Sequence, residues 1–355
     1  MKVIGNKVRG NREQGIGNSG RRHRRIVGVL AAMLLLGACG SGEGKGEPVR
    51  FTVPRGAGMS SVADTLQKRQ VISSPATFKL YARMKSATAK LRPGVYEVRP
   101  GAAYDLILRK LTTGDVVKTR LVIPEGWELR RIAPRLAQVT GVSEDSVLSR
   151  LMDPAQAQKY GVPGPTLEGY LYPATYVFPM GASLDVMVRE LTTQYKRAWT
   201  PAMRQRAQAL RMSEREVVTL ASIVEKEAKV WTERPTIARV YHNRLQRRMR
   251  LEADPTVQYA LGEHQRRLLR RHIQQVADDP YNTYRHSGLP PGPIASPSRG
   301  AIEATLNPAE HDYLFFVARA NGTHVFTRTY NEHLREVARY RAEMRAQRAR
   351  QPATP

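Results

Sequence analysis

The stretch that most constrains the fold is a predicted helix over residues 213–228. It opens with Ser213 and, three positions later, Glu216, a pairing typical of a capping box in which each side chain binds the other residue's backbone N–H. Apolar residues then recur at helical spacing, so we expect this helix to bury a face in a core. It ends in Glu-Lys-Glu at positions 225–227, which places two carboxylates at the end of an apolar helix.

A helical wheel separates these two carboxylates. Glu227 follows Ile223 and Val224 by four and three residues, so it lies at the edge of the apolar stripe. Glu225 lies about 160° away from it, because two helical steps turn about 200°. A carboxyl held against apolar surface keeps its proton to higher pH, which suits a general acid near neutral pH. Glu227 is therefore the candidate acid and Glu225 a structural or groove-edge residue; alternatively, both form salt bridges at the helix end.

The charge of the chain restricts its partners. It contains 57 Lys and Arg against 31 Asp and Glu, a formal net charge of +26. Such a charge favours nucleic acids, lipid headgroups or cell-wall polymers. No basic stripe interleaved with aromatic residues, zinc-finger spacing or RNA-binding motif is present, so we predict no nucleic-acid binding.

The single cysteine, Cys39, follows a basic and then an apolar segment. The apolar run, residues 26–38, is short for a membrane span but has the length of a signal peptide's apolar region. Leu-Gly-Ala-Cys at 36–39 is similar to a bacterial lipobox, which predicts lipidation of Cys39; alternatively, residues 1–39 hold a single uncleaved span. Both interpretations predict a protein at the bacterial cytoplasmic membrane whose later residues lie on the periplasmic, extracytoplasmic side.

Residues 40–48 are expected to form a flexible tether, and residues 49–117 a small module. Alternation and helical spacing in this module predict strands at 49–53 and 94–98, and helices at 59–66, after Pro75 and at 103–111. The β-α-α-β order resembles LysM glycan-binding modules; alternatively, the module is an α+β spacer.

Residues 118–345 are predicted to form a larger, mixed α+β catalytic domain, so the fold class is α+β with a small LysM-like module in front. Residues 121–126 repeat the strand and Pro-x-Gly pattern of residues 51–56. Residues 346–355 are predicted to be a disordered tail. The other elements expected are helices at 129–139, 184–198, 203–210, 299–305 and starting at Glu233 and Tyr330, and strands at 313–318 and 324–327.

Two segments of this domain are dense in Gly, Pro and Tyr. In residues 167–176, Glu168 stands among three tyrosines, a combination that suits sugars because rings stack on pyranose faces and carboxylates bind hydroxyls; alternatively, this is a core strand with a satisfied glutamate. Residues 288–297 contain so many prolines and glycines that a rigid loop is predicted.

Four motifs resemble one known family. Their order and spacing are similar to those of the endolytic murein transglycosylase family (MltG, or YceG-like), over roughly residues 49–340. The motifs are Ala-Ser-Ile-Val-Glu-Lys-Glu at 221–227, Asp-Pro-Thr-Val at 254–257, Tyr-Asn-Thr-Tyr at 281–284 and Gly-Leu-Pro-Pro-Gly-Pro-Ile-Ala at 288–295. The resemblance implies a membrane-anchored enzyme that cleaves the MurNAc-GlcNAc β-1,4 bond inside nascent peptidoglycan strands. It further implies 1,6-anhydro-MurNAc ends, termination of strand elongation, and catalysis by the second glutamate of the 225–227 tripeptide, Glu227. Many members carry a full transmembrane helix where this chain has the short run ending at Cys39.

This chemistry needs only one carboxyl group, whereas a hydrolytic glycosidase needs two. The muramoyl C6 hydroxyl attacks C1 of its own sugar, so one carboxyl can protonate the leaving oxygen and then accept the hydroxyl proton. Glu227 is predicted to be that group. The candidates for binding the glycan around it are Glu168, Asp254, Asn282 and Tyr284.

Alternatives stay open for the function and for two of these residues. A hydrolytic muramidase would use Glu168 or Asp254 as its second carboxylate, and a non-catalytic peptidoglycan-binding scaffold would recruit a peptidoglycan synthase. Asp254 could also cap a helix, and Asn282 could hold the Pro/Gly loop. The sequence contains no His-Glu-x-x-His or Walker motif, and its histidines lack ligand spacing, so no metal or other cofactor is predicted.

Overall fold

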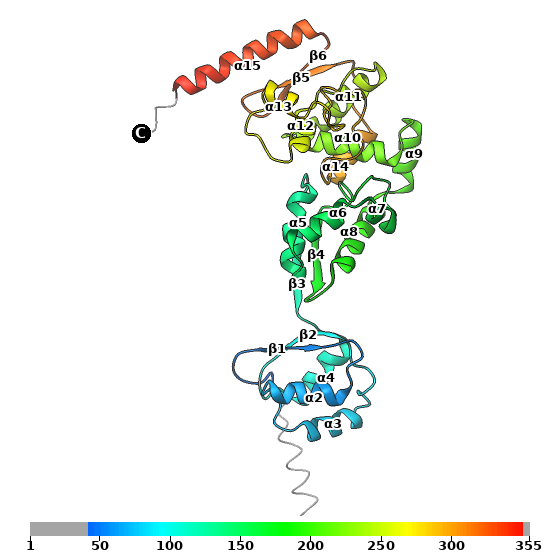
Figure 1. Ribbon diagram of the computed structural model, residues 1–355, viewed down its shortest axis with the longest axis vertical. Helices are drawn as coiled ribbons and strands as arrows, with labels where there is room; N and C mark the ends of the chain where they lie inside the picture. Colours follow the sequence, from blue (N-terminus) through cyan, green and yellow to red (C-terminus); the bar gives the residue numbers. More distant parts are fainter. Residues whose placement is uncertain (1–41, 351–355) are drawn as a thin grey trace, which may run out of the picture. The chain divides into compact units, whose positions relative to one another are not determined.

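The structure is a computed structural model that describes residues 42–350 (Figure 1). The chain separates into two compact units, with the boundary between Val117 and Lys118. Helices are combined with three two-stranded antiparallel sheets in the described residues, which confirms the α+β fold class. The predictions for residues 1–39, including the lipidation of Cys39, lie outside the described residues.

The first unit is built around one short sheet. β1 (Val49–Val53) and β2 (Gly94–Val98) pair antiparallel with Phe51 opposite Tyr96, and the two rings stack at 5.8 Å. Apolar side chains from all the elements of this unit form its core. The helices are α2 (Met59–Lys68) and α3 (Pro75–Met84), between the strands, and α4 (Tyr104–Thr113), after them.

The segment before β1 is hydrogen-bonded to the residues between β2 and the next helix. The Lys45 N–H donates to the Pro100 carbonyl at 2.9 Å, and the Ala103 N–H donates to the Gly42 carbonyl at 3.2 Å. Gly44 has a φ of +85°, and a Cβ there would lie 2.6 Å from the Pro100 carbonyl oxygen. The backbone approaches this closely because glycine has no side chain. Residues 42–45, within the segment predicted to be a flexible tether, thus contact the residues just before α4.

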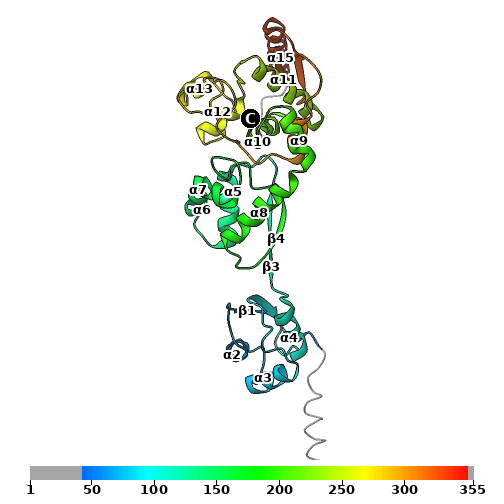
Figure 2. The ribbon, with the colours of Figure 1, turned by 90° about the vertical axis from the view of Figure 1, so that its right-hand side faces the viewer.

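The second unit contains the two other sheets and most of the helices (Figure 2). β3 pairs with β4 and β5 with β6, both antiparallel. The sequence patterns missed α6 and α7, whose caps are Ser143 and Asp153. In chain order the elements are β3 (Lys118–Ile123), α5 (Leu129–Thr140), α6 (Glu144–Met152), α7 (Pro154–Tyr160), β4 (Ala174–Pro179), α8 (Leu184–Ala198), α9 (Pro201–Ala209), α10 (Glu214–Glu227), η1 (Trp231–Glu233), α11 (Arg234–Gln246), α12 (Asp254–Leu261), α13 (Arg270–Gln275), α14 (Arg299–Leu306), β5 (Phe315–Ala318), β6 (His324–Thr327) and α15 (Tyr330–Arg350).

Helix α10 lies at the centre of the second unit, in contact with α9, α11, α12 and α14. Val217, Val218 and Ala221 belong to one apolar cluster, while Leu220 and Ile223 belong to another. Residues 217–224 are consequently all buried. The sequence predicts burial of one face, but the structure buries every face because neighbours pack on all sides.

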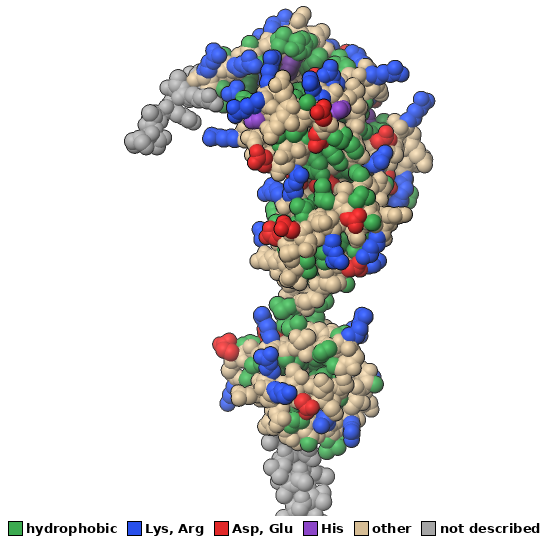
Figure 3. Space-filling view, viewed as in Figure 1, with side chains coloured by type: hydrophobic (Ala, Val, Ile, Leu, Met, Phe, Trp, Pro, Cys, Tyr) green, Lys and Arg blue, Asp and Glu red, His purple; other side chains and the backbone are tan. Residues whose placement is uncertain are grey.

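The last helix, α15, continues to Arg350. Residues 346–350 of the predicted tail (346–355) therefore belong to a helix, whose Ala, Arg, Glu and Gln residues are strong helix formers; the last five residues lie outside the described part. Lys and Arg side chains are scattered over the visible surface rather than gathered in one patch (Figure 3). Between residues 42 and 350, no helix combines the length and apolar character needed to cross a membrane.

Candidate active site

The helix that carries the candidate acid begins with the predicted capping box. The Glu216 N–H donates to Ser213 Oγ at 3.3 Å, and the Ser213 N–H donates to Glu216 Oε2 at 2.8 Å. These reciprocal bonds satisfy backbone donors that a helix N-terminus leaves free. The cap fixes the start of α10, and burial of residues 217–224 holds its direction up to the three charged residues at its end.

Glu225 is bound to the start of α14. Its carboxylate accepts hydrogen bonds from Arg234 Nη2 at 2.8 Å and from the Ser298 N–H at 3.0 Å, and also from the Ser298 hydroxyl. Ser298 is itself the N-cap of α14. Because these contacts occupy both carboxylate oxygens, Glu225 has the structural role that the sequence predicts.

Lys226 binds the turn between β3 and α5. Its Nζ lies 3.1 Å from Glu128 Oε1 and 3.4 Å from the Gly126 carbonyl oxygen. The same turn pairs with the Pro/Gly loop, since the Gly126 N–H donates to the Ser296 carbonyl and the Ser296 N–H donates to the Trp127 carbonyl, both at 2.8 Å. Lys226 thus joins the end of α10 to a turn about a hundred residues earlier.

Glu227 faces α11, where the Tyr241 hydroxyl donates to its Oε1 at 3.1 Å. The side chain is half-buried. Burial and the negative charge of Asp254 raise the pKa of Glu227 to about 7, although the Tyr241 hydrogen bond and the positive charge of Arg244 act to lower it. A carboxyl with this pKa is substantially protonated at neutral pH, so it can act as a general acid and then as a base.

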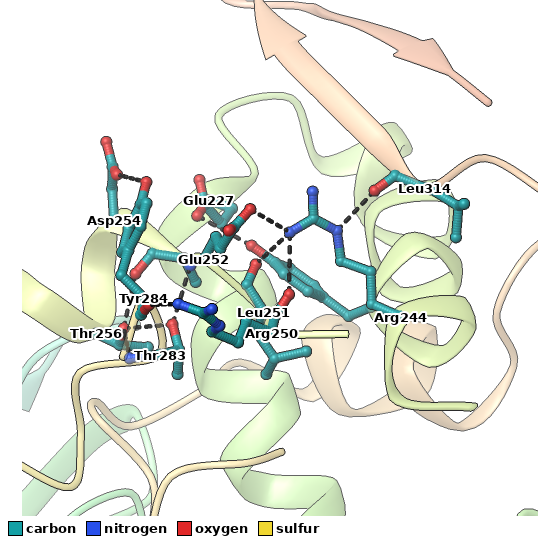
Figure 4. A network of polar contacts seen from close by, with 12 residues as sticks. Glu227, Arg244, Arg250, Leu251, Glu252, Asp254, Thr256, Thr283, Tyr284 and Leu314 are labelled. Atoms are coloured by element: carbon teal, nitrogen blue, oxygen red, sulfur yellow. Dashed lines mark hydrogen bonds and ion pairs between the residues drawn. The ribbon is translucent and has the colours of Figure 1, made fainter. Parts of the chain in front are cut away.

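Arg244, on α11, was not singled out from the sequence. It is only 7% exposed, and its guanidinium lies 5.0 Å from the Phe315 ring centre. It donates to the carbonyl oxygens of Leu314 at 2.6 Å and Leu251 at 2.9 Å, and to Glu252 Oε2 at 3.3 Å. Arg244 therefore holds the loop before α12 beside Glu227 (Figure 4). Its position in the sequence was a signal of this role, because a residue seven positions after Ile237 lies on the same face of the helix.

Asp254 and Tyr284 form a pair next to Glu227. The Tyr284 hydroxyl donates to Asp254 Oδ1 at 2.6 Å. Asp254 is the first residue of α12 but makes no capping hydrogen bond, and its side chain is exposed. Figure 4 shows Glu227 between this pair and Arg244. The structure thus brings together three of the predicted site residues, although they lie up to 57 positions apart in the chain.

Two buried threonines join the second and third motifs. The hydroxyls of Thr256 and Thr283 lie 2.8 Å apart, and the Ala253 N–H donates to Thr283 Oγ1 at 3.0 Å. The Glu252 N–H donates to the Thr283 carbonyl at 3.2 Å. These bonds place Asp254 against Tyr284, which explains why the two motifs each carry a threonine.

The sequence profile of the YceG-like family matches residues 51–339. The chain belongs to the YceG-like family. An endolytic murein transglycosylase of Bacillus subtilis (strain 168) is 34% identical over 311 residues, which cover 82% of this chain and 84% of that protein. An endolytic murein transglycosylase of Streptococcus pneumoniae serotype 2 (strain D39) is 29% identical over 322 residues, which cover 82% of this chain and 58% of that protein.

A solved structure is also similar to this YceG-like chain. The crystal structure of a YceG-like protein from Listeria monocytogenes has 34% sequence identity and a TM-score of 0.56. The match covers 81% of this chain and 98% of that chain. The family resemblance predicted from the four motifs is therefore confirmed.

Two other residues of this YceG-like chain that were predicted to bind the glycan are buried. Glu168 is 2% exposed, and the Leu129 N–H at the start of α5 donates to both its carboxylate oxygens, at 3.1 and 3.2 Å. Burial raises the pKa of Glu168 to about 8. Asn282 is fully buried; its Nδ2 donates to the carbonyls of Ile273 and Val276, and its Oδ1 accepts from the Tyr284 N–H. The contacts of Glu168 favour the alternative of a satisfied core glutamate, whereas the Asn282 side chain binds the end of α13 and Tyr284 instead of the Pro/Gly loop.

No cluster of His, Cys, Asp and Glu side chains in the described part of the chain could hold a metal ion. Figure 4 shows the carboxylates of Glu227, Glu252 and Asp254 in one region of the site. Arg244 and the tyrosine hydroxyls of Tyr241 and Tyr284 bind these carboxylates instead. The arrangement therefore suits proton transfer to a bound substrate.

Proposed function

We propose that this chain is a peptidoglycan lytic transglycosylase that cleaves glycan strands internally, with Glu227 as its acid and base. The observation that carries the proposal is the setting of Glu227, whose pKa is raised to about 7 beside an exposed carboxylate–tyrosine pair. The two relatives named above as endolytic murein transglycosylases support the reaction class.

In the proposed reaction, the protonated Glu227 gives its proton to the oxygen of the MurNAc-GlcNAc β-1,4 bond as the bond from C1 to that oxygen breaks. The C6 hydroxyl of the same MurNAc attacks C1 and gives its proton to the Glu227 carboxylate. The products are a 1,6-anhydro-MurNAc end and a free GlcNAc hydroxyl. Glu227 regains its starting state, so no water molecule and no second acid are consumed.

Asp254 and Tyr284 are the proposed glycan-binding residues. Both are accessible beside Glu227, and the Tyr284 hydroxyl orients Asp254 Oδ1, which leaves Oδ2 available for a sugar hydroxyl. A carboxylate there would also stabilise positive charge that develops at C1. Glu168 and Asn282 are assigned supporting roles, because their polar groups already bind the backbone.

The test replaces Glu227 by Gln in the full-length protein, purified in detergent. Wild-type protein should release fragments with anhydro-muramoyl ends from nascent, uncrosslinked strands, as identified by mass spectrometry. Glu227→Gln should lower the rate by about 100-fold or more, since it removes general acid–base catalysis. Glu263→Gln, an exposed change in the loop after α12, is the matched control and should keep the rate. Undiminished cleavage by Glu227→Gln would refute the enzyme assignment of this site and favour a binding scaffold.

A hydrolytic muramidase is the second candidate. Asp254 is near enough for its charge to raise the pKa of Glu227, and its side chain would be the second carboxylate that hydrolysis requires. The products separate the two reactions. Hydrolysis leaves reducing muramoyl ends that are heavier than anhydro ends by one water molecule. Reducing ends that also disappear in Asp254→Asn would favour the muramidase, whereas anhydro ends in the wild type favour the transglycosylase.

The location and the partners of the enzyme are also proposals. Anchoring at residues 1–39, through a lipid on Cys39 or a single span, would hold both units on the extracytoplasmic side of the membrane. There the enzyme would meet newly made strands and a peptidoglycan synthase. The first unit, residues 49–117, would serve as the LysM-like glycan-binding module.

A further inference from the structure

Glu227 presents its two carboxyl oxygens differently. Oε1 accepts the hydrogen bond from the Tyr241 hydroxyl at 3.1 Å. Oε2 has no hydrogen-bond partner among residues 42–350. A carboxylic acid carries its proton on one oxygen, and the oxygen that accepts a hydrogen bond is the carbonyl-like one. The asymmetry therefore assigns the proton of the neutral acid to Oε2.

Tyr241 is held firmly in this position. Its side chain is 1% exposed, and its ring packs edge-on against Phe316 with 5.8 Å between centres and an interplanar angle of 89°. Tyr241 belongs to the apolar cluster that includes Ile223 and Val224 of α10, and Phe316 packs against that cluster. Burial and the nearby Glu227 charge raise the pKa of Tyr241 well above 10, so its hydroxyl stays a donor while Glu227 titrates.

We propose that Tyr241 is the positioning residue that selects Glu227 Oε2 as the oxygen that exchanges protons with the glycan. Its hydroxyl binds Oε1, so the Oε2 proton moves to the glycosidic oxygen as the C1–oxygen bond breaks. The C6 hydroxyl proton then returns to Oε2, and the Tyr241 O–H bond stays intact throughout. This inference rests on the proposed function, because it concerns the same proton transfers.

The charged groups around Glu227 come from each element packed against it. Asp254 on α12 disfavours the carboxylate, whereas Arg244 and Tyr241 on α11 favour it. Lys226, the neighbour in the chain, is engaged by Glu128. Removing the Tyr241 hydroxyl takes away one of the two interactions that favour the carboxylate and leaves burial and the charge of Asp254 in place, so the pKa of Glu227 should rise.

The experiment measures the pH dependence of kcat and kcat/KM for Tyr241→Phe in the full-length protein. Phenylalanine keeps the ring and its packing on Phe316. We expect kcat to fall by about tenfold, which is less than the roughly 10²–10⁴-fold that a positioned acid–base group itself contributes, because Glu227 is still present. We also expect the alkaline decline of kcat/KM to move to higher pH, since a Glu227 with a higher pKa stays protonated longer.

The matched control is Tyr195→Phe on α8. The Tyr195 hydroxyl is equally buried and donates to the carboxylate of Glu214 at 2.6 Å, but Glu214 lies at the opposite end of α10. This variant should keep the wild-type pH profile. If Tyr241→Phe lowers activity and stability as Tyr195→Phe does, with no movement of the alkaline limb, the positioning role is refuted.

A second substitution keeps the test decisive if Tyr241→Phe fails to fold. Site-specific replacement of Tyr241 by 3-fluorotyrosine makes the phenol a stronger donor with little change in shape. The alkaline limb should then move to lower pH, opposite to the effect of Tyr241→Phe. An unmoved limb would overturn the proposal. Glu227→Gln remains a separate test: if that variant still cleaves glycan, the proposed function fails whatever the tyrosine variants show.

Discussion

At the scale of single residues, the Glu-Lys-Glu end of α10 sends three consecutive side chains to three different elements. Glu225 binds the start of α14, Lys226 binds Glu128 before α5, and Glu227 binds Tyr241 on α11. Each side chain therefore helps to fix the position of the carboxyl that is free to react. Because the bonds of Glu225 and Lys226 are largely shielded from solvent, we expect them to contribute more than exposed ion pairs do.

Glu168 gives a prediction about stability and pH. Its pKa is about 8 in the folded protein against a usual 4.5, so the folded state binds more protons between these values. The stability contributed by the neutral form is full below pH 4.5 and is lost as the pH rises through 8. Glu168→Gln cannot ionise, so its free energy of unfolding should decline less than the wild type's over this window, by roughly 2–4 kcal/mol.

Urea unfolding at pH 5 and pH 9 (approximately the ends of that window), followed by tryptophan fluorescence, checks this prediction. Trp127, Trp199 and Trp231 all lie in the second unit, so the signal reports the unit that contains Glu168. The pKa of Glu227 is also raised, but Glu227 is present in both proteins and therefore does not contribute to the difference between them. Equal declines in the wild type and Glu168→Gln would show that Glu168 does not titrate in this range.

At the scale of elements, the Pro/Gly loop of residues 288–297 acts as a brace along α10. The Ile294 N–H donates to Ser222 Oγ at 3.0 Å, and Ser296 pairs with the turn that contains Gly126 and Trp127. Gly169, at a φ of +82°, lies so close to this loop that a Cβ would come within 2.4 Å of Pro293. The loop therefore joins α10, the β3–α5 turn and the segment that contains Glu168.

Ser222→Ala tests this brace. Ser222 is fully buried, and its loss leaves the Ile294 N–H without an acceptor, which should cost about 1–3 kcal/mol of stability. We also expect slower glycan cleavage, because the loop begins only four residues after Tyr284. Ser149→Ala, on the exposed side of α6, should change stability by less than about 0.5 kcal/mol. Thermal unfolding and cleavage assays on both variants decide the matter, and a Ser222→Ala as stable as Ser149→Ala would contradict the proposed brace.

At the scale of the whole molecule, each unit has a core of its own, and α10 joins two apolar clusters within the second unit. The formal charge of +26 is distributed, and many arginines have structural partners. Arg234 binds Glu225, Arg244 binds backbone carbonyls, and Arg328 binds Asp312. Such arginines need no anionic polymer to account for them.

Membrane attachment is a property of the whole chain, and Cys39→Ser tests it. If the protein is a lipoprotein, the substitution should move most of it from the membrane fraction to the soluble fraction, because the hydrophobic anchor is lost. Cell fractionation followed by immunoblotting measures the distribution. A variant that stays in the membrane fraction would contradict lipidation and favour a single N-terminal span.

The sequence by itself determined the features that depend on near neighbours. Periodicity located β1 at 49–53 and α8 at 184–198, and cap residues located the start of α10, because these elements are set by local backbone preferences and hydrogen bonds. The helical wheel likewise separated Glu225 from Glu227, since the angle between two positions on a helix is fixed by its geometry.

Only the tertiary structure decided which distant residues meet. The wheel places Glu227 at the edge of an apolar stripe, but Tyr241 and Arg244 reach it through the packing of α11 on α10. Glu168, Asn282 and Tyr284 look equally suited to sugars in the sequence, yet the path of the chain buries the first two against backbone groups. Burial and long-range contacts set pKa values and free hydrogen-bonding groups, and neither can be read from local spacing.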